Sequence, residues 1–464
     1  MVFEEIFEPF IRESAVSVMF RGTLENVFSS QRLDQLFETT AVKQRQGQLL
    51  FSTCADLLSL VVLKAQKSLN AVYVAQKDQL TVSVKSVYDK IAGIETVVSE
   101  RLVRDTAADL SAIVDELGAA VQGPLAGYDV RILDGNHLAG TDHRLAELRR
   151  LGAAALPGQT LCVLDPQRQL LLDVVTCEDG HANERTLIPA ILERMREKQC
   201  WIADALFCTL AYMFGVRQRR AFFLVRQHGG LKGELQGKRK KIGRGSTGMV
   251  YEQPLLLRHS DGSEMTVRRI TIVRDKPTSK GETEVHLLTN LPAKVSAVKA
   301  AEAYLDRWNI EQAFQEVTTT LRCEIDTLGY PKAALFGFSL ALVVHNVVST
   351  VKAALRVSGQ GTAEQRQRIS TYYLADEIAG VSRGMAIAIP AAHWEETFGT
   401  LTPKQLAAKL KWLAAKVDLK RFQTHRWTPK QPQPKRLSGN RGNHVSTFAL
   451  LKQRASKSRV IARK

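Results

Sequence analysis

The periodicity of the apolar residues changes near Tyr128, and this change constrains the fold more than any other feature of the chain. Residues 1–125 repeat their apolar positions with a helical period and contain few glycines or prolines, as in LLFSTCADLLSLVVLKAQ. After Tyr128, short strand-like runs such as DVRILD, QTLCVLD and WIADA alternate with helical patterns such as ERTLIPAILERMREK. The sequence therefore predicts an all-helical N-terminal domain followed by a layered α/β domain with a mixed sheet.

The segment at 229–281 is rich in Gly and Lys and contains alternating strand-like pieces, as in MVYEQPLLLRHSDGSEMTVRRITIVRD, which predicts a β-rich insertion in the α/β domain. One long helical pattern follows at 292–321. The expected organisation of the 464 residues is a helical DNA-binding domain at 1–125, an α/β core at 126–228 and 282–350, the insertion at 229–281, a helical region at 351–419 and a basic arm at 420–464.

The net charge of +17 favours a polyanionic partner, with nucleic acid first and an anionic membrane surface second. A basic protein without such a partner is the alternative. Residues 420–464 contain thirteen Lys or Arg and no Asp or Glu, and they are rich in Pro, Gly and Gln. This composition predicts an extended arm that contacts phosphates, or else a solvated tail.

Several classes of protein are disfavoured. The six cysteines show no C-x-x-C spacing, so we expect small buried side chains in a reducing compartment and neither a zinc site nor disulfides. The first residues, MVFEEIFEPFIRES, lack the basic start of a secretory signal. His345 and Asn346 interrupt the apolar run AALFGFSLALVVHNVVSTVKAAL, which favours a buried helix over a membrane span. We expect no membrane partner.

Two segments are candidates for DNA contact. KSLNAVYVAQKDQLTVSVKSVYDKI predicts a helix, a break at 80–82, a cap at Ser83 and a second helix that exposes Lys85 and Lys90. This arrangement is typical of a helix-turn-helix, although short helix pairs without DNA contact are common. In the insertion, Lys240 and Lys241 of LQGKRKKIGRG are candidates to line a DNA path, with a solvated loop as the alternative.

Two aspartates stand at similar places. Asp134 ends the strand-like run VRILD and Asp204 ends CWIAD, and functional groups gather at the carboxyl ends of strands in open α/β sheets. Asp134 is also followed by Gly135, and Asp-Gly after alternating apolar residues is a strong hairpin signal. We therefore expect a turn at Gly135 that leaves Asp134 at the edge of the sheet.

A third carboxylate lies in the helical pattern AAEAYLDRWNIEQAFQEVTTTLR. Tyr304, Arg307 and Glu311 are spaced i, i+3 and i+7, so they share one helix face. A surface Arg-Glu pair is the simpler interpretation, and a carboxylate beside phosphate-binding side chains is the functional one. For Trp201 and Trp308, core packing is the expected role and stacking on a base the alternative.

Phosphodiester chemistry gives a reason to bring three carboxylates together. Two Mg²⁺ ions about 4 Å apart can activate the nucleophile, stabilise the leaving oxygen and neutralise the phosphate. Mg²⁺ prefers oxygen ligands and keeps several waters, so a few Asp and Glu suffice without a His or Cys cluster.

In this order, the motifs ILDGNHL, WIADALFCT, FFLVRQH, EVHLLTNLP and YLDRWNIEQAFQEV resemble the DDE transposases of bacterial insertion sequences. The similarity is to the insertion-sequence-four group, which a Tyr-Arg-Glu-Lys signature marks, and it runs from about Ser30 to beyond His345. The resemblance implies an RNase H-like catalytic core interrupted by a β-strand insertion. It also implies a nucleoid-associated protein of the bacterial cytoplasm.

The resemblance assigns roles by position. Asp134, Asp204 and Glu311 correspond to the catalytic triad that ligates Mg²⁺, for which Mn²⁺ can substitute, and Tyr304 and Arg307 correspond to contacts with DNA phosphate near the cleaved end. The implied function is to bind the terminal inverted repeats of an insertion sequence as a homodimer, to cut the ends and to join them to target DNA.

One position departs from the signature. Its lysine should lie seven residues after Glu311, where this chain has Thr318. At about 100° per residue, Arg322 would fall on the face of Glu311 one turn beyond. One hypothesis is that Arg322 supplies the missing cation, and the alternatives are that the contact is absent or comes from the insertion. The departure also admits a catalytically impaired or repurposed transposase-derived DNA-binding protein.

Overall fold

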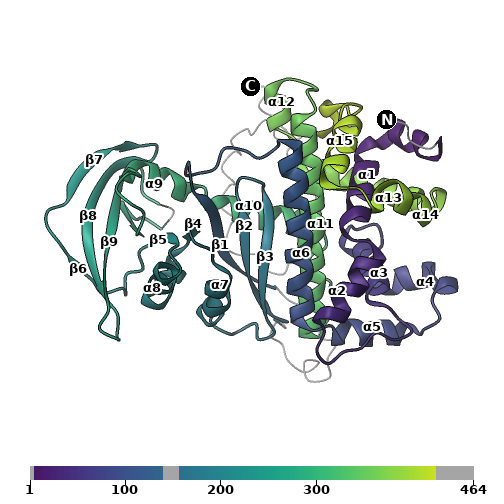
Figure 1. The fold of residues 1–464 in the computed structure, drawn as a ribbon, viewed down its shortest axis with the longest axis horizontal. Coiled ribbons are helices and arrows are strands. Elements are labelled where there is room, and N and C mark those ends of the chain that lie inside the picture. The colour runs from purple at the N-terminus through teal and green to yellow at the C-terminus, as the bar shows by residue number, and fades with distance from the viewer. Residues whose placement is uncertain (1–4, 139–155, 279, 425–464) are drawn as a thin grey trace, which may run out of the picture. The chain divides into compact units, whose positions relative to one another are not determined.

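The computed structural model describes residues 5–138, 156–278 and 280–424, and it confirms the predicted mixed α/β class. A ten-stranded sheet runs in the order β3-β2-β1-β4-β5-β10-β9-β8-β6, with β7 paired to β8 (Figure 1). The strands are β1 (Asp129–His137), β2 (Gln159–Asp165), β3 (Leu170–Cys177), β4 (Gln199–Ala203), β5 (Phe222–Arg226), β6 (Glu234–Leu235), β7 (Lys240–Gly245), β8 (Gly248–Arg258), β9 (Glu264–Arg274) and β10 (Glu284–Thr289).

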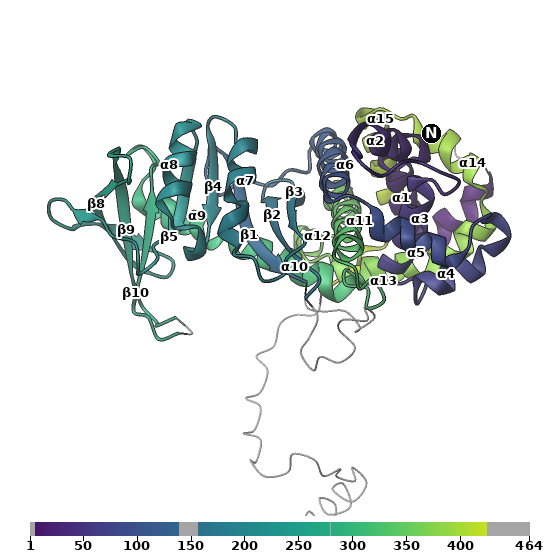
Figure 2. The same ribbon diagram turned by 90° about the horizontal axis from the view of Figure 1, so that it is seen from below.

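The middle of the sheet is covered on both faces. β1, β4 and β5 are parallel neighbours, and β2, antiparallel to β1, is buried along its whole length. Helices α7 (Ile188–Arg194) and α8 (Leu210–Gln218) pack on one face, where they share a core with Leu133. The other face carries α10 (Trp308–Thr320), and Figure 2 shows these helices on opposite sides of the strands. Burial on both faces explains why these strands read as continuous apolar runs.

The N-terminal helices do not form a core of their own. They share one apolar core with the later helices and with one face of the sheet, and residues 1–423 form one compact unit. The change of periodicity near Tyr128 therefore marks a change of secondary structure within a continuous core. The N-terminal helices are α1 (Glu8–Val27), α2 (Ser30–Thr40), α3 (Phe51–Val62), α4 (Leu69–Ala75), α5 (Val84–Gly93) and α6 (Thr96–Leu117).

Helix α11 (Pro331–Val357) is the longest described helix and lies beside α6 (Figure 1). Its segment Pro331–Arg356 is long and apolar enough to cross a membrane, but 94% of its most apolar window is buried within the protein. The amide of Asn346 accepts from the backbone N–H of Leu171 and donates to its carbonyl, both at 2.8 Å, which fixes α11 to strand β3. The prediction of a buried helix is confirmed.

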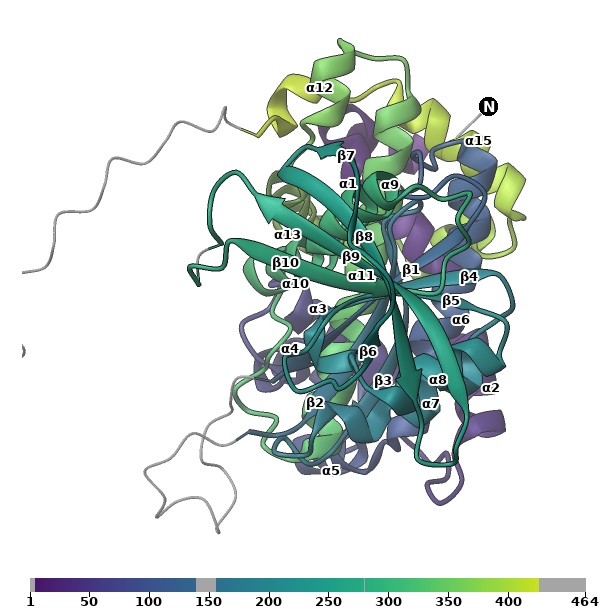
Figure 3. The ribbon, with the colours of Figure 1, turned by 90° about the vertical axis from the view of Figure 1, so that its left-hand side faces the viewer.

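The segment predicted as a β-rich insertion contains β6 to β9. β8 and β9 pair along eleven residues each, and β10 then returns to pair with β5. These strands extend the central sheet, because β10 joins β9 to β5 within it. Figure 3, seen from the end that carries β6 to β9, shows the twist of the sheet.

The single helix predicted at 292–321 is wrong. Two helices occupy this stretch, α9 (Ala297–Leu305) and α10, with a turn at Asp306 and Arg307 between them. The region predicted as helical at 351–419 contains α12 (Ala363–Gln367), α13 (Thr371–Ala388), α14 (Ala391–Trp394) and α15 (Pro403–Ala414). Of the predicted basic arm, residues 425–464 lie outside the described residues.

All six cysteines are free, and five of them are buried, as predicted for small core side chains. Cys177, at the end of β3, is half-buried.

Candidate active site

Asp134 lies where β1 loses its neighbour on one side. β1 pairs with β4 only as far as Leu133, whose partner Ala203 is the last residue of β4. On the other side, β1 stays paired with β2 as far as His137. Because Asp204 directly follows Ala203, the open edge of β1 at Asp134 meets the end of β4, as expected for the carboxyl ends of parallel strands.

The predicted hairpin turn at Gly135 is wrong. β1 continues through this residue, with Asp134 opposite Cys162 and His137 opposite Gln159. The backbone hydrogen bonds that a turn would use locally are made with β2 instead. The Asp-Gly signal was overridden because a long partner strand is available on this side of β1.

The alternation of β1 sends successive residues to opposite faces of the sheet. Ile132 packs in the core on the α10 side, and Leu133 packs in the core that contains α7. By the same alternation, Asp134 faces α10, where it meets Arg307, and Gly135 faces Glu184 in the chain that leads into α7.

Arg307, in the turn before α10, joins the first and third predicted carboxylates. Its guanidinium donates to Asp134 Oδ2 at 3.2 Å and pairs with Glu311 Oε1 at 2.6 Å. The pKa of Asp134 is raised to about 6, with burial as the main cause and the charges of Asp204 and Glu311 acting in the same direction, while Arg307 and the N–H of Gly135 act against the shift. The three predicted carboxylates therefore lie close enough to affect one another.

Asp204 is held at the end of β4 by a cap. Its Oδ1 accepts from the N–H of Leu206 at 2.8 Å, at the start of the short 3-10 helix η4 (Ala205–Phe207). Its charge raises the pKa of Asp134 on one side and of Glu184 on the other. The charge of Asp204 therefore acts on carboxylates at both faces of β1.

Glu184 is a carboxylate that the sequence reasoning missed. It begins the 3-10 helix η3 (Glu184–Leu187), and its side chain is only 13% exposed. Its Oε1 lies 3.5 Å from His137 Nδ1, and burial, together with the charge of Asp204, raises its pKa. In the sequence it reads only as the first residue of a helical pattern, and no spacing connects it with Asp134. We call Asp134, Glu184, Asp204, Arg307 and Glu311 the strand-end site.

Tyr304 and Trp308 flank Arg307. Tyr304 lies in the last turn of α9, where burial raises the pKa of its hydroxyl, and the neighbouring Arg307 opposes that shift. Trp308 is 58% exposed, with the Arg307 guanidinium 5.5 Å from its ring centre, so its predicted role in the core is wrong. Trp201, at 3% exposure, is a core residue as predicted.

The donor chemistry of the strand-end site fits a hard divalent cation. Four carboxylates offer only oxygen donors, which Mg²⁺ and Mn²⁺ accept. Within 5–138, 156–278 and 280–424, no three Asp, Glu, His or Cys side chains are already grouped to hold a metal. The Arg307 guanidinium bridges Asp134 and Glu311 instead, so a positive charge already lies among the carboxylates. A cation that uses both of these residues requires Arg307 to leave at least one of them.

Residues 126–346 match the family model of the transposase DDE domain. All four carboxylates of the strand-end site fall within these residues. A solved structure, the "Cryo-EM structure of piggyBac transposase synaptic complex with hairpin DNA (SNHP)", is similar at a TM-score of 0.39 and 10% identity, over 85% of this chain and 84% of that chain. No curated protein matches the chain.

Within the matched residues 126–346, α10 ends too early for Arg322 to replace the signature lysine. The helix stops at Thr320, and Leu321 is extended (φ −110°, ψ 166°), so the helical angle cannot be continued to Arg322. Arg322 lies in the following loop, where its guanidinium contacts the carbonyl of Lys67. The proposal that Arg322 continues the face of Glu311 is therefore wrong.

Thr318 itself lies on the exposed surface of α10. Its hydroxyl donates to the carbonyl of Phe314 at 3.0 Å, and Thr319 and Thr320 make similar bonds one turn back. Bonds of this kind turn the hydroxyl groups toward the helix backbone. Thr318 consequently supplies no charge to the strand-end site.

The helix pair before the DDE domain forms as predicted, but its two lysines differ. α4 and α5 flank a break, and Ser83 caps α5 by accepting from the N–H of Ser86. The Lys85 side chain is 86% exposed and pairs with Asp89 at 3.3 Å. The Lys90 amine donates to the carbonyl of Arg45 at 2.7 Å and is half-buried, so the expectation that α5 exposes it is wrong. Packing between helices decides whether Lys90 is exposed, and the apolar pattern of the sequence does not specify that packing.

Lys240 and Lys241 lie on β7 within the insertion of the DDE domain. Both side chains are exposed. The neighbouring Arg239 pairs with Glu284 and Arg244 with Asp275. Lys240 and Lys241 therefore lie on an ordered strand and not in the solvated loop that was the alternative.

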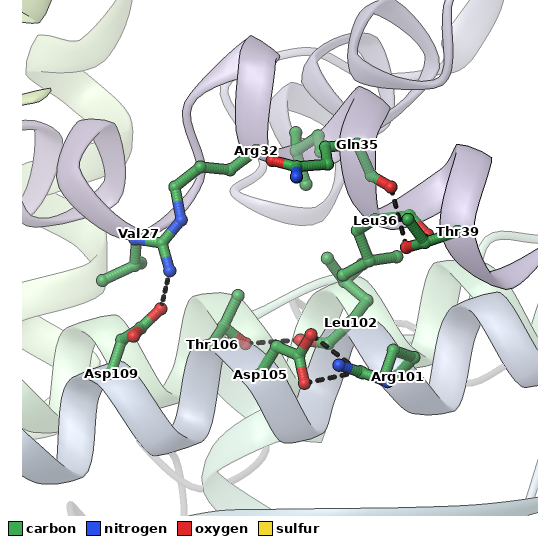
Figure 4. A pocket seen from close by; sticks show the side chains of 11 residues that line it. Val27, Arg32, Gln35, Leu36, Thr39, Arg101, Leu102, Asp105, Thr106 and Asp109 are labelled. Carbon is green, nitrogen blue, oxygen red and sulfur yellow. Dashed lines mark hydrogen bonds and ion pairs between the residues drawn. The ribbon is translucent and has the colours of Figure 1, made fainter.

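A polar cavity of about 240 Å³ lies outside the DDE domain, between α2 and α6 (Figure 4). Its charged side chains are two arginines and two aspartates, and each pairs with one of the opposite sign: Arg32 with Asp109, and Arg101 with Asp105. We call this the α2–α6 cavity. Its paired charges leave no excess for an ionic ligand.

Proposed function

We propose that this protein is a DDE transposase, which binds the terminal inverted repeats of an insertion sequence and catalyses Mg²⁺-dependent cleavage and transfer of DNA strands. The observation that carries the proposal is the convergence of Asp134, Asp204 and Glu311 within residues that match the transposase DDE domain. These residues come from two strand ends and one helix, and the first and last of them, Asp134 and Glu311, are 177 residues apart along the chain (311 − 134).

In this proposal, Asp134, Asp204 and Glu311 hold the metal ions. Mg²⁺, when bound, activates the attacking water or 3′-hydroxyl and neutralises charge on the phosphate. Mn²⁺ is expected to substitute, since it accepts the same oxygen donors. The cap that Asp204 makes with Leu206 fixes one of its oxygens and so limits the rotation of the carboxylate.

Arg307 and Tyr304 hold DNA phosphate near the cleaved end. A guanidinium that bridges two carboxylates has the planar geometry to bind two phosphate oxygens as well, so Arg307 exchanges a carboxylate for phosphate. The exposed Trp308 beside it offers a ring for stacking on a base. The chain acts as a homodimer on paired double-stranded ends at the bacterial nucleoid, and Lys85, Lys240 and Lys241 contribute phosphate contacts.

The test uses the inverted repeats that should flank the coding region in genomic DNA. A labelled duplex that carries one repeat is incubated with the full chain and Mg²⁺, and cleavage at the end of the repeat is expected. Asp204→Asn should abolish cleavage while binding to the repeat persists. Cleavage without preference for the repeat would instead indicate a general nuclease, and cleavage by Asp204→Asn would contradict the assigned site.

A second candidate is a transposase-derived DNA-binding protein without catalysis. Thr318 favours it, because it removes a cation expected beside Glu311 and no described residue on α10 replaces it. This candidate predicts specific binding to the repeat with no Mg²⁺-dependent cleavage by the wild-type chain. Restoring the signature with Thr318→Lys should then produce or raise cleavage.

A further inference from the structure

Another cavity, of about 140 Å³, lies between α10 and α11, beside the turn that joins β2 to β3. We call it the α10–α11 cavity. It is smaller than the pockets that hold whole cofactors, so its volume suits a group of a few atoms. Its polar lining includes Gln169, Glu316, His345, Ser349, Lys352 and Arg356.

The α10–α11 cavity carries more positive than negative charge. Lys352 and Arg356 line it one turn apart on α11, and among the described residues that line it Glu316 is the only carboxylate. The Lys352 amine lies 3.5 Å from Glu316 and donates to the Thr371 hydroxyl at 2.8 Å. Arg356 pairs with no carboxylate within 5–138, 156–278 and 280–424, and its guanidinium donates to the neutral amide of Gln169. The positive charge of Arg356 is therefore left over.

Both cations are enclosed, so the excess charge is unfavourable. The Lys352 side chain is 13% exposed, and burial lowers the pKa of both Lys352 and Arg356. A cation taken out of water without a counter-charge destabilises the folded chain, and an anion in the cavity would offset this.

His345 is an independent indication that a ligand binds here. It lines the cavity at 3% exposure, and its Nδ1 is buried with no hydrogen-bond partner among the described residues. Burial lowers the pKa of His345 to about 4, so the ring is neutral and donates from one nitrogen only. When the Ser349 hydroxyl donates to Nε2, 3.4 Å away, the proton lies on Nδ1. Buried donors normally have an acceptor, and a ligand oxygen would supply one.

The α10–α11 cavity opens onto the exposed face of α10. Gln312 lines the cavity and is itself exposed, and Trp308, Gln315 and Thr319 are the exposed residues beside it. All four are uncharged. At about 100° per residue, this face lies between Glu311 and the cavity. A DNA strand whose phosphate lies at the strand-end site can cross this face and reach the cavity with another phosphate.

We propose that the α10–α11 cavity binds one phosphate group, which accepts charged hydrogen bonds from Arg356 and a hydrogen bond from His345 Nδ1, while Lys352 offsets the charge of Glu316. The planar guanidinium suits phosphate oxygens. Free phosphate and the DNA backbone present the same chemistry, and the exposed face of α10 favours DNA. For DNA, the inference rests on the proposed function, since it places a further phosphate of the strand bound there.

The first arm of the test needs neither DNA nor metal. Inorganic phosphate is titrated into the full chain by calorimetry, in chloride buffer of fixed ionic strength, and binding is expected. Arg356→Gln removes the excess charge and should weaken phosphate binding by about tenfold or more. Arg219→Gln is the matched control, because Arg219 is also half-buried and donates to a neutral group, the carbonyl of Gly215. It should leave phosphate affinity unchanged.

Ser349→Leu is a second variant, which keeps every charge and fills part of the cavity. It should weaken phosphate binding in the same direction, with a melting curve that shows a folded chain. Wild-type phosphate affinity in folded Arg356→Gln would overturn the proposal, and so would the absence of phosphate binding by the wild-type chain.

The second arm identifies the source of the phosphate. The affinity of the full chain for a labelled DNA duplex of random sequence is measured against salt concentration. Each phosphate contact contributes about 0.9 to the slope of log affinity against log salt, so Arg356→Gln should make the slope shallower by about 0.9. Arg219→Gln should not change it. A lost phosphate response with an unchanged slope would support the site and identify free phosphate as its ligand.

The two arms also separate this inference from the proposed function. Phosphate binding that depends on Arg356, in a chain that cleaves no repeat-bearing duplex, would support the cavity and contradict the transposase. Mg²⁺-dependent cleavage by the wild-type chain, with wild-type phosphate affinity in Arg356→Gln, would overturn the cavity alone.

Discussion

The strand-end site and the α2–α6 cavity both bring arginines to carboxylates, but they balance charge differently. In the α2–α6 cavity, Arg32 and Arg101 each have one aspartate, and the charges cancel (Figure 4). In the strand-end site, the single guanidinium of Arg307 serves two carboxylates, and two more carry no arginine among the described residues. The comparison teaches that carboxylate charge is balanced pair by pair in the α2–α6 cavity and is only partly compensated in the strand-end site.

The largest expected difference between the two regions is in strand cleavage. Glu311→Gln should lower the rate of Mg²⁺-dependent cleavage of a repeat-bearing duplex by about a thousandfold or more, because it removes a proposed metal ligand. Asp109→Asn, which removes a carboxylate from the α2–α6 cavity, should leave the rate unchanged. Gel assays of cleaved ends with both variants compare the regions directly, and equal losses would break the distinction.

The next largest difference is in the free energy of unfolding that is lost when one arginine is removed from each region. Arg307→Ala leaves the Asp134 and Glu311 carboxylates without their shared cation and should lower the free energy of unfolding by about 3 kcal/mol. Mn²⁺ should restore part of this loss, since a cation can take the place of the guanidinium.

Arg32→Ala in the α2–α6 cavity is the matched control. It should lower the free energy of unfolding by less than about 1 kcal/mol and show no response to Mn²⁺, because the pair is partly exposed. Denaturant unfolding with and without Mn²⁺ measures both variants, and a Mn²⁺ response in Arg32→Ala would contradict the comparison.

A smaller effect concerns pH. Burial and neighbouring charge raise the pKa of Asp134 from 3.8 to about 6, so its ionised form destabilises the folded chain at neutral pH. Asp134→Asn should therefore be more stable than the wild type by about 2 kcal/mol at about pH 7.5. As the pH falls through about 6, the wild type takes up the proton and the difference should shrink, vanishing near about pH 4.

Denaturant unfolding in buffers without divalent ions at both pH values tests this prediction. A constant difference between the two chains would mean that the substitution acts through packing and not through charge.

The smallest effect is expected for Asp105→Asn. Arg101 and Asp105 form an exposed pair one turn apart on α6, with side chains 53% and 41% exposed. Their loss should change the free energy of unfolding by no more than about 0.5 kcal/mol. A larger loss would show that the α2–α6 cavity depends on its ion pairs more than exposed pairs normally allow.

The sequence predicted the parts of the strand-end site that follow a regular pattern. Asp134 and Asp204 were found because each ends an apolar strand run, and parallel strands bring their carboxyl ends to one edge. Arg307 and Glu311 were found because residues four apart are neighbours in helical backbone, and Arg307 keeps helical angles (φ −53°, ψ −32°) as the residue before α10. These relations need only local geometry.

The errors have a common physical origin. The turn expected at Gly135 gave way to pairing with β2, and the Arg322 prediction failed because α10 ends at Thr320. Lys90 was expected to be exposed, yet it donates to a carbonyl of another segment. In each case a contact distant in sequence, or the end of an element, overrode a correct local pattern.

The sequence by itself determined most of the segments that become strands and helices, because apolar periodicity is present in the order of residues. It placed two carboxylates at strand ends and a third within a helical pattern. Only the tertiary structure decided that Arg307 bridges Asp134 and Glu311 and that Glu184 lies against Gly135. Asp134-Gly135 in β1 is a clear example of a contact that the tertiary structure decided. Gly135 forms no turn, and it leaves room for the Glu184 carboxylate from a segment 49 residues further on (184 − 135). Such contacts depend on how the sheet and the loop before α7 pack together, which no local spacing records.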